Sequence, residues 1–532
     1  MPTSLETVEE YMEAVFRRGR EPMEPAHFEP NWNDQPSRHK TYLDVDRIRL
    51  TESSPENLPS AFDVLLAGGT AAGKRDQPWD LDAITFLLRN SYSPLNRRLR
   101  INWNQDSEVR ELYSQSLWGR GAASGGGMYP LEIYLVTSGD FAALSPGIYH
   151  YSTAHNALER LLVGDVTATV RNALPNRETD LAFLLVTSRF WKNSFKYNSF
   201  CYHVVTQDLG ALMQVWRYLA TSSGRPIHPR LLFDDRALNG LLGLDELDES
   251  VLGVVPLGEG ASQGAPTDAR IETSRFHERS HVTRRFETVS RVHEAVLDAP
   301  VIVPTDPTVV PTTTTDAPES VGVVSLPHAP DYPGDGTIPE VLRDRRSSFG
   351  AFSSTRTTTV EELSVILSAA ERAGAETNES WDGAIPAPSV FVLANRIEGL
   401  PSGSWEHRAD SGELWPIHLG PIAHALQLNY YLSNYNLQEA AAVLAIAGNW
   451  SAAREQHGAR AYRLVNFSVA AVAQSVNVAA TAIGVGSGIV LGFDNISIDE
   501  MLDLDGTPRR TFLFVIIGKE RPDAAQFTSD IK

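Results

Sequence analysis

The alternation of hydrophobic and polar residues predicts a protein built from short buried strands and longer helices. Four apolar runs of six or seven residues have the length and the β-branched and aromatic content of buried strands. They are Leu131–Thr137, Ala182–Thr187, Ser389–Ala394 and Thr511–Ile517. Asp208–Leu219 and Phe467–Ala480 have the character of helices, the first amphipathic and the second apolar. The mixture predicts an α+β or α/β fold, and periodicity alone does not distinguish the two.

These elements belong to an internal repeat. A shift of 260 positions places Tyr202 on Tyr462, Gly224 on Gly484 and Gly258 on Gly518. Earlier in the chain the shift is 256 positions, and it places Arg89-Asn90-Ser91 on Arg345-Arg346-Ser347. Two copies of one unit in a single chain predict a fused dimer.

The repeat and the composition together divide the chain into four segments. Residues 1–80 are polar and rich in proline, with one amphipathic stretch near Leu5–Arg18, and we interpret them as an N-terminal extension. Residues 81–260 form the first domain and residues 337–532 the second. Residues 261–336 contain a Pro/Thr-rich stretch that cannot bury enough apolar surface to fold alone. We predict that they are a linker long enough to let the two domains pair.

The composition excludes several classes of function. The chain has 532 residues and a net charge of −20, which argues against a surface for nucleic acid. Cys201 is the single cysteine, so there is no internal disulfide and no cysteine-built zinc site. No metal-ligand spacing, phosphate-binding P-loop or serine-hydrolase elbow is present. Without a signal-peptide pattern or a membrane-length apolar run, we expect a cytoplasmic protein.

Three polar or glycine-rich segments are candidates for a binding site. Ser124-Gly125-Gly126-Gly127 precedes a strand and leaves backbone N–H groups free for a ligand, although a plain flexible turn has the same composition. Arg345-Arg346-Ser347 offers guanidinium and hydroxyl donors suited to phosphate, or simply a basic helix end. The glycine-dense loop 484–494 includes Leu491 and Gly492 and can donate from its backbone. The equivalent loop of the first copy contains Pro226 and Pro229, which remove donors.

Lys196-Tyr197 is the candidate for proton transfer. The pair precedes the helix of the first copy, where the second copy has Gln456-His457. In a partly desolvated cleft a lysine and a tyrosine can move a proton if their surroundings lower the pKa values. A surface lysine beside a packed tyrosine is the simpler interpretation of these two residues alone.

In combination these segments resemble the nitroreductase-like FMN flavoproteins, and among them the SagB-type azoline dehydrogenases. The resemblance covers about 440 residues in pieces and omits the linker. The residues that carry it are SGGGMYPLEIYLV (124–136), PGIYHY (146–151), FKYNSFCYHVVTQDLGALMQ (195–214), RRSSFGAF (345–352), AIGVGSGIVLGFD (482–494) and WNDQPSRHKTY (32–42).

The resemblance implies an α+β fold of two tandem domains that form an intramolecular pseudo-dimer, with FMN bound between them. It implies that the second copy binds FMN through Arg345, Arg346, Ser347, Leu491 and Gly492. The first copy would contribute Ser124, Gly125 and Gly126, with Lys196 and Tyr197 as the catalytic pair. The reciprocal site lacks this pair and has GAIPAPSV (383–390) in place of the glycine run, so we expect one FMN per chain.

The activity implied is oxidation of peptide thiazolines or oxazolines to thiazoles or oxazoles during the maturation of a ribosomal peptide. The expected partners are an azoline-containing precursor peptide and a cyclodehydratase complex. Two alternatives stay open. One is a different flavin oxidoreductase, such as a cyclic-peptide oxidase or an NAD(P)H-dependent nitroreductase. The other is a non-catalytic pseudo-dimer that sequesters FMN.

Overall fold

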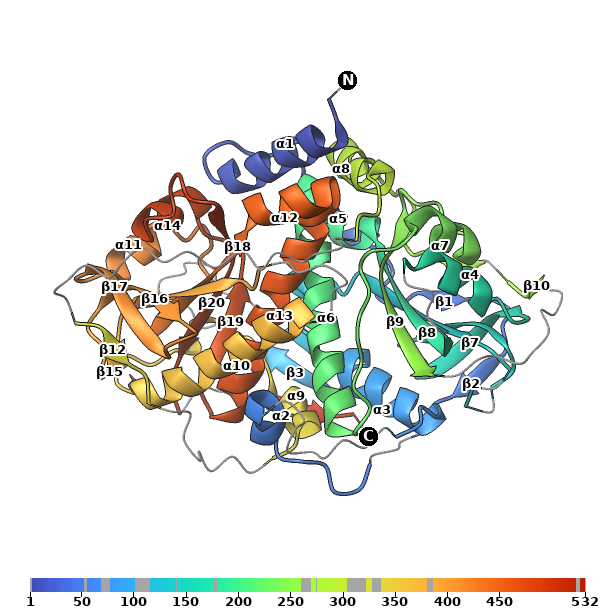
Figure 1. Cartoon of the computed structure of the whole chain (residues 1–532), viewed down its shortest axis with the longest axis horizontal. Coiled ribbons are helices and arrows are strands. Elements are labelled where there is room, and N and C mark those ends of the chain that lie inside the picture. Colours follow the sequence, from blue (N-terminus) through green and yellow to red (C-terminus); the bar gives the residue numbers. More distant parts are fainter. Residues whose placement is uncertain are drawn as a thin grey trace.

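Two antiparallel β-sheets form the outer parts of the molecule, one from each half of the chain (Figure 1). The computed structural model describes residues 2–51, 55–67, 77–100, 115–139, 141–142, 144–175, 179–259, 269–273, 275–303, 322–327, 336–379, 386–522 and 527–531. The first sheet has the strand order β10-β7-β6-β5-β8-β9, with β2 also paired to β7. The second has the order β12-β17-β16-β14-β18-β20-β19.

Most of the strands and helices of the two halves follow one another in the same order. The first half contains β2 (Arg47–Arg49), α3 (Leu81–Tyr92), β5 (Leu131–Thr137), β6 (Gly147–Ser152), β7 (Ala157–Val163), α4 (Thr167–Ala173), β8 (Asp180–Arg189), α5 (Phe190–Tyr197), α6 (Cys201–Ser222), α7 (Asp235–Leu242), β9 (Glu249–Glu259) and β10 (Arg270–Ile271). The second contains β12 (Val324–Ser325), α9 (Ile338–Asp344), α10 (Val360–Glu379), β14 (Ser389–Ala394), β16 (Gly403–Arg408), β17 (Glu413–Leu419), α11 (Ala423–Leu428), β18 (Ala442–Asn449), α12 (Trp450–His457), α13 (Ala461–Ala482), β19 (Gly486–Val490), α14 (Asn495–Met501) and β20 (Arg509–Gly518). From α5 and α12 onward, equivalent elements begin 260 positions apart, except that β19 has no equivalent strand.

Helices α6 and α13 cross in the centre of the molecule and hold the halves together (Figure 1). They approach closely at Gly210, where an added Cβ would lie 2.2 Å from the Phe467 carbonyl oxygen. Polar side chains also pair across this interface. His203 Nδ1 lies 2.7 Å from Tyr462 Oη, and Gln207 donates to Asn466 over 2.9 Å. The contact is therefore a continuous core rather than a loose domain interface.

Part of the predicted linker is folded. Helix α8 (Glu287–Asp298) packs against α1 (Ser4–Arg17), and strand β11 (Phe276–His277) pairs with β1 (Thr41–Tyr42). The helix forms because Val289, Val292 and Val296 bury one apolar face although the flanking segments are polar. The Pro/Thr-rich stretch 304–321 lies outside the described residues.

One strand from the end of the chain joins the first half. Strand β21 (Phe527–Asp530) pairs with β3 (Asn96–Arg100), which in turn pairs with β4 (Gln115–Gly119). The resulting three-stranded sheet is built from both copies of the repeat. Arg98, Leu117 and Thr528 of this sheet line the space between the halves.

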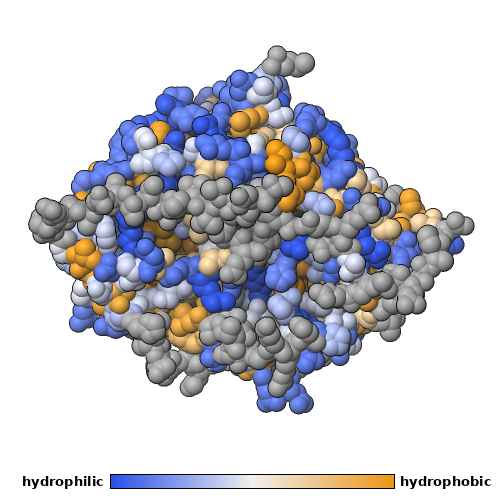
Figure 2. Space-filling view, viewed as in Figure 1, coloured by the Kyte–Doolittle hydropathy of each residue, from blue (hydrophilic) through white to orange (hydrophobic). Residues whose placement is uncertain are grey.

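The long apolar helix is an interior element. Residues 450–482 are long and apolar enough to cross a membrane by length and composition, but 94% of the most apolar window is buried inside the protein. On the face shown in Figure 2, hydrophilic residues predominate and hydrophobic ones form only small groups. The helix therefore belongs to the core of the protein.

Candidate functional site

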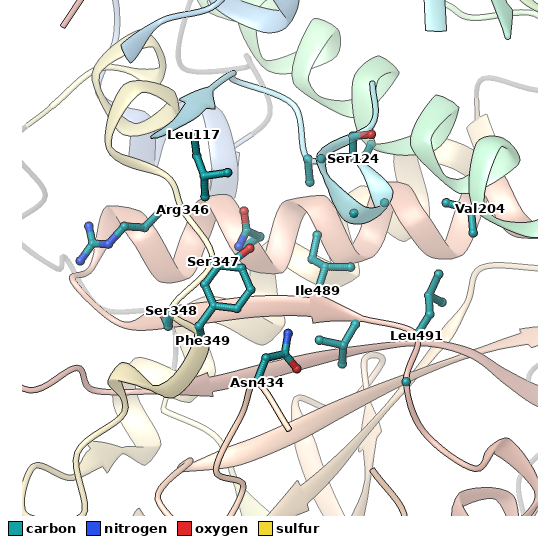
Figure 3. Close-up of a pocket in the computed structure, with 18 of the residues that line it drawn as sticks. Leu117, Ser124, Val204, Arg346, Ser347, Ser348, Phe349, Asn434, Ile489 and Leu491 are labelled. Carbon is teal, nitrogen blue, oxygen red and sulfur yellow. The ribbon is translucent and has the colours of Figure 1, made fainter. Parts of the chain in front are cut away.

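A cavity of about 1190 Å³ lies between the two halves, and all ten residues predicted for the site line it. The first half contributes Ser124, Gly125, Gly126, Lys196 and Tyr197, and the second contributes Arg345, Arg346, Ser347, Leu491 and Gly492. Figure 3 shows Leu117 and Ser124 on one wall, with Ile489, Leu491 and Asn434 facing them. The fold therefore brings together the residues predicted from the sequence, and their roles stay a prediction.

The glycine-rich segment of the first half is fixed by a buried carboxylate. Asp208 on α6 accepts hydrogen bonds from the Ser124 hydroxyl over 2.6 Å and from the Gly125 N–H over 2.8 Å. Burial raises the pKa of Asp208 to about 7, although both of these hydrogen bonds lower it. Ser124 also accepts from the Tyr129 N–H over 2.9 Å. The segment is therefore an ordered turn that presents its backbone to the cavity.

The Lys196–Tyr197 pair lies directly on this turn. Gly126 has the left-handed φ of 58°, and the Lys196 ammonium donates to its carbonyl oxygen over 3.4 Å. Lys196 is exposed, whereas Tyr197 is half-buried. Burial, and secondarily the nearby Asp208, raises the pKa of the Tyr197 phenol. The phenol is therefore protonated at neutral pH and is available as a hydrogen-bond donor.

Arg345 joins the two halves. Its buried guanidinium donates to the carbonyl oxygens of Gly121 and Arg120 over 2.9 and 3.0 Å, and to Asn477 over 3.1 Å. The three carbonyls from Arg120 to Ala122 lead directly into the Ser124 turn. Arg345 thus positions the first half's turn against the second half, and it brings a positive charge to the cavity wall.

Three further cations surround the Arg345–Gly350 segment. Arg98 donates to the carbonyls of Arg343 and Arg345 over 2.6 and 2.9 Å. Arg521 donates to the Gly350 carbonyl, and Arg346 forms an ion pair with Glu520. Burial, together with the charges of Arg345 and Arg346, lowers the pKa of Arg98 to about 10. A concentration of positive charge beside the Ser347 hydroxyl is suited to a phosphate group.

The predicted glycine-dense loop of the second half is partly a strand. Residues Gly486–Val490 form β19 at the edge of the sheet and pair with β20. The glycines there allow close packing, since a Cβ on Gly488 would lie 1.9 Å from Tyr435 Oη. Leu491 and Gly492 follow the end of this strand, with the Gly492 carbonyl accepting from the Tyr431 N–H over 2.7 Å.

Several cavity residues were not predicted from the sequence. Arg18 follows α1, lies 4.5 Å from the Phe200 ring centroid and donates to the Leu491 carbonyl. No motif indicated that the N-terminal extension reaches the site. Asp208 stood within a segment quoted for the resemblance, and its being the single acidic residue of this helix was the signal that could have identified it.

Backbone strain also concentrates at this cavity. Tyr129 and Phe349 line it with φ values of 49° and 47°, which are rare for bulky side chains. Asn198, the residue after Tyr197, has φ 42°. Such conformations persist where the surrounding structure enforces them, which occurs most often at functional sites.

The reciprocal position is filled by protein side chains. Arg89–Ser91 lie inside α3, whereas Arg345–Ser347 follow the end of α9. The Ser91 hydroxyl donates to the Leu87 carbonyl over 2.7 Å and accepts from the Trp216 indole N–H over 2.8 Å. Both side chains are fully buried. Of the segment 383–390, residues 383–385 lie outside the described residues.

Known proteins are similar to this chain in both sequence and fold. A protein-family sequence model described as "Nitroreductase family" matches residues 342–519. "Putative nitroreductase MJ1384" of Methanocaldococcus jannaschii is 30% identical over 175 residues, which cover 32% of this chain and 86% of that protein. "Trifolitoxin-processing protein TfxB" of Rhizobium leguminosarum bv. trifolii is 26% identical over 136 residues, or 24% of this chain and only 36% of that protein.

The likeness in fold extends over both halves. A crystal structure of a "putative nitroreductase" from Anabaena variabilis superposes with a TM-score of 0.70 at 20% identity, covering 97% of this chain and 99% of that one. The predicted fold class, two nitroreductase-like domains in an α+β pseudo-dimer, is confirmed. Family membership points to an oxidoreductase. On the sequence match to MJ1384 and the match to the family model, the chain belongs to the nitroreductase family.

Proposed function

We propose that the protein is an FMN-dependent dehydrogenase that oxidises thiazoline or oxazoline rings of a peptide to thiazoles or oxazoles. The observation that carries the proposal is the position of Lys196 and Tyr197 against Gly126, in the same cavity as Ser347 and Leu491. The similarity to a trifolitoxin-processing protein supports a peptide as the substrate. A cyclodehydratase complex is the partner that would supply the ring, and we propose a cytoplasmic location.

The residues of the cavity fit FMN. Ser347, with the charges of Arg98, Arg345, Arg346 and Arg521, would hold the phosphate. The backbone at Leu491 and Gly492 would contact the ring system from the second half, and the Ser124–Gly126 turn would cover it from the first. The buried hydroxyl of Ser348 has no hydrogen-bond partner among the described residues, so a polar group is missing from this wall.

The chain's own residues supply the proton chemistry. Oxidation of an azoline removes a hydride and a proton from the ring, and bound FMN supplies the acceptor for the hydride. Tyr197, protonated because of its raised pKa, donates a hydrogen bond that orients the ring. The Lys196 ammonium is exposed and can first release a proton to solvent, and the resulting amine is the acceptor to which we assign the ring proton.

The direct test is oxidation of a synthetic azoline peptide by the FMN-loaded protein under air. Mass spectrometry should show the loss of two hydrogens per ring, and anaerobic mixing should bleach the flavin absorbance only when peptide is present. Rapid bleaching by NAD(P)H without any azole formation would instead favour a nitroreductase. A bound flavin that neither reagent reduces would favour the non-catalytic alternative.

Flavin stoichiometry tests the single-site prediction. We expect one FMN per chain, because Trp216 and Ser91 occupy the position equivalent to the proposed phosphate site. Absorbance of FMN released from a known amount of protein measures this ratio. A ratio of two would mean that the reciprocal position opens, and the single-site prediction would then be wrong.

Gly126→Ala should lower azole formation by roughly tenfold or more while FMN stays bound, since a misplaced catalytic group costs rate before affinity. The new Cβ would lie 2.5 Å from Tyr197 Oη and 2.6 Å from Lys196 Nζ, and would displace the pair. Gly127→Ala is the matched control, because Gly127 also has a positive φ of 68° but no atom within 4 Å of the added Cβ. Equal initial rates for the two variants would show that backbone strain, rather than displacement of the pair, causes the loss.

A further inference from the structure

The cavity is strongly basic although the chain is acidic. The whole sequence has 46 basic and 66 acidic residues. The cavity reverses this ratio, since its lining includes eight arginines and lysines but only Asp208 and Glu520 as acids. An excess of basic residues in a cavity of an acidic chain indicates that its ligands are anionic.

Most of these cations have no carboxylate to neutralise them. Arg346 pairs with Glu520. Six other arginines of the lining have no carboxylate oxygen within 4.0 Å among the residues that the structure describes. They are Arg18, Arg38, Arg98, Arg120, Arg345 and Arg521. Uncompensated charge in a partly buried position is costly, so a bound anion is expected to offset it. Six uncompensated arginines are more than the two negative charges of one phosphate dianion can neutralise.

The side chains of two of the six, Arg38 and Arg120, have no hydrogen bond to the Arg345–Gly350 segment among the described residues. The Arg120 guanidinium lies 4.3 Å from the Tyr129 ring centroid and donates to the Tyr92 carbonyl over 2.9 Å, whereas its Nε has no hydrogen-bond partner among the described residues. Arg120 is only 3% exposed. Arg38 is exposed, and the positive charge of Arg120 contributes to lowering its pKa after burial does. Both side chains line the same cavity.

The segment that carries Arg38 is firmly anchored. The buried Lys40 donates to Glu249 over 2.7 Å and to Tyr134 over 2.8 Å. His39 lies 2.8 Å from the Thr153 hydroxyl. The backbone at Arg38 is thus held at the cavity wall by its neighbours, which lowers the cost of ordering this segment when a ligand binds.

The mouth of the same cavity is apolar. Leu117 and Trp118 from the first half are 39% and 37% exposed, and Tyr431 and Leu432 from the second are 44% and 53% exposed. Exposed apolar and aromatic side chains around a basic wall fit a peptide that carries both apolar and acidic groups. This combination distinguishes a peptide from a purely anionic small molecule.

We propose that Arg38 and Arg120 bind a carboxylate of the peptide substrate, so that an acidic residue beside the azoline selects the ring for oxidation. This inference rests on the proposed function and specifies its substrate class. The carboxylate replaces the missing counter-charge of the two guanidinium groups. Leu117, Trp118, Tyr431 and Leu432 contact the adjoining apolar residues of the peptide.

The experiment compares two azoline peptides that differ only by aspartate or asparagine next to the ring. With the FMN-loaded protein at low ionic strength, the aspartate peptide should have a KM roughly tenfold lower at equal kcat, and added salt should shrink the difference. Arg38→Gln should remove the preference, whereas Arg270→Gln, on an exposed strand outside the cavity, should retain it. Fluorescence anisotropy of the labelled peptides gives the same comparison as dissociation constants, without turnover.

Equal KM values for the two peptides in the unmodified protein would overturn the inference, as would an equal loss of preference in Arg270→Gln. The inference would also be overturned if the protein showed no peptide preference and bound NADPH tightly, and if Arg38→Gln abolished that binding. Arg38 and Arg120 would then bind a phosphate of the nucleotide instead of a peptide carboxylate. If neither peptide is oxidised but the aspartate peptide still binds more tightly, the proposed function fails while the carboxylate site stands.

Discussion

Lys196→Met should slow azole formation by roughly 10²- to 10⁴-fold, the range that a positioned general base contributes. Methionine keeps the unbranched stem of lysine but has no amine, so it removes the proton acceptor with little change in shape. The lost hydrogen bond to the Gly126 carbonyl is long, at 3.4 Å, and FMN content should therefore be unchanged. Initial rates by mass spectrometry and flavin absorbance of the purified variant measure the two quantities.

Tyr197→Phe separates orientation from proton transfer. Phenylalanine keeps the edge contact with Phe200, whose ring centroid lies 6.2 Å away, but cannot donate a hydrogen bond. We expect a smaller loss of rate than in Lys196→Met, with flavin still bound. Wild-type rates in both variants would remove the pair from catalysis, and a larger loss in Tyr197→Phe would reverse the two roles.

Asp235→Ala should lower the free energy of unfolding by about 3–5 kcal/mol, as expected when one partner of a buried ion cluster is removed. Asp235 belongs to the first half and accepts from Arg460 and Arg463 of the second, and all three side chains are buried. The substitution leaves two guanidinium groups in the core without a counter-charge. Urea unfolding followed by tryptophan fluorescence measures the change.

Asp298→Ala is the matched control for Asp235→Ala. Asp298 also pairs with an arginine, Arg236, but the two side chains are 61% and 50% exposed. Exposed pairs contribute about 0–1 kcal/mol, so this variant should unfold nearly as the original does. Similar losses in the two variants would contradict a special role for the cluster between the halves.

The regular elements could be predicted from the sequence because they depend on local patterns. Strands β5 and β14 have the predicted bounds, and the runs in β8 and β20 lie inside longer strands. Strand β19 could not be predicted, because its glycines are needed for close packing against Tyr435 and Ser348, which lie far away in the sequence. Helix α8 was missed for a related reason, since its apolar face is buried by elements far away in the sequence, chiefly α1 and also α6.

The residues that line the site could be predicted from the sequence, but the hydrogen bonds between them could not. The repeat and the motifs identified residues such as Lys196 and Ser347, which do line one cavity. They did not show that Arg345 is bonded to the carbonyls of Arg120 and Gly121, because backbone acceptors leave no signature in a sequence. Arg18 was missed since its role depends on how the N-terminal helix docks.

Trp216, packed on Ser91, has a consequence for how such a chain can evolve. In a symmetric homodimer any substitution appears at two places at once, so a side chain that blocks one site also blocks the other. Fusion of the two copies removes that constraint. A tryptophan can then fill one position as core while its counterpart 260 residues later is Val476, in the helix that lines the remaining cavity. A single mutation can then change one half of the protein without changing the other.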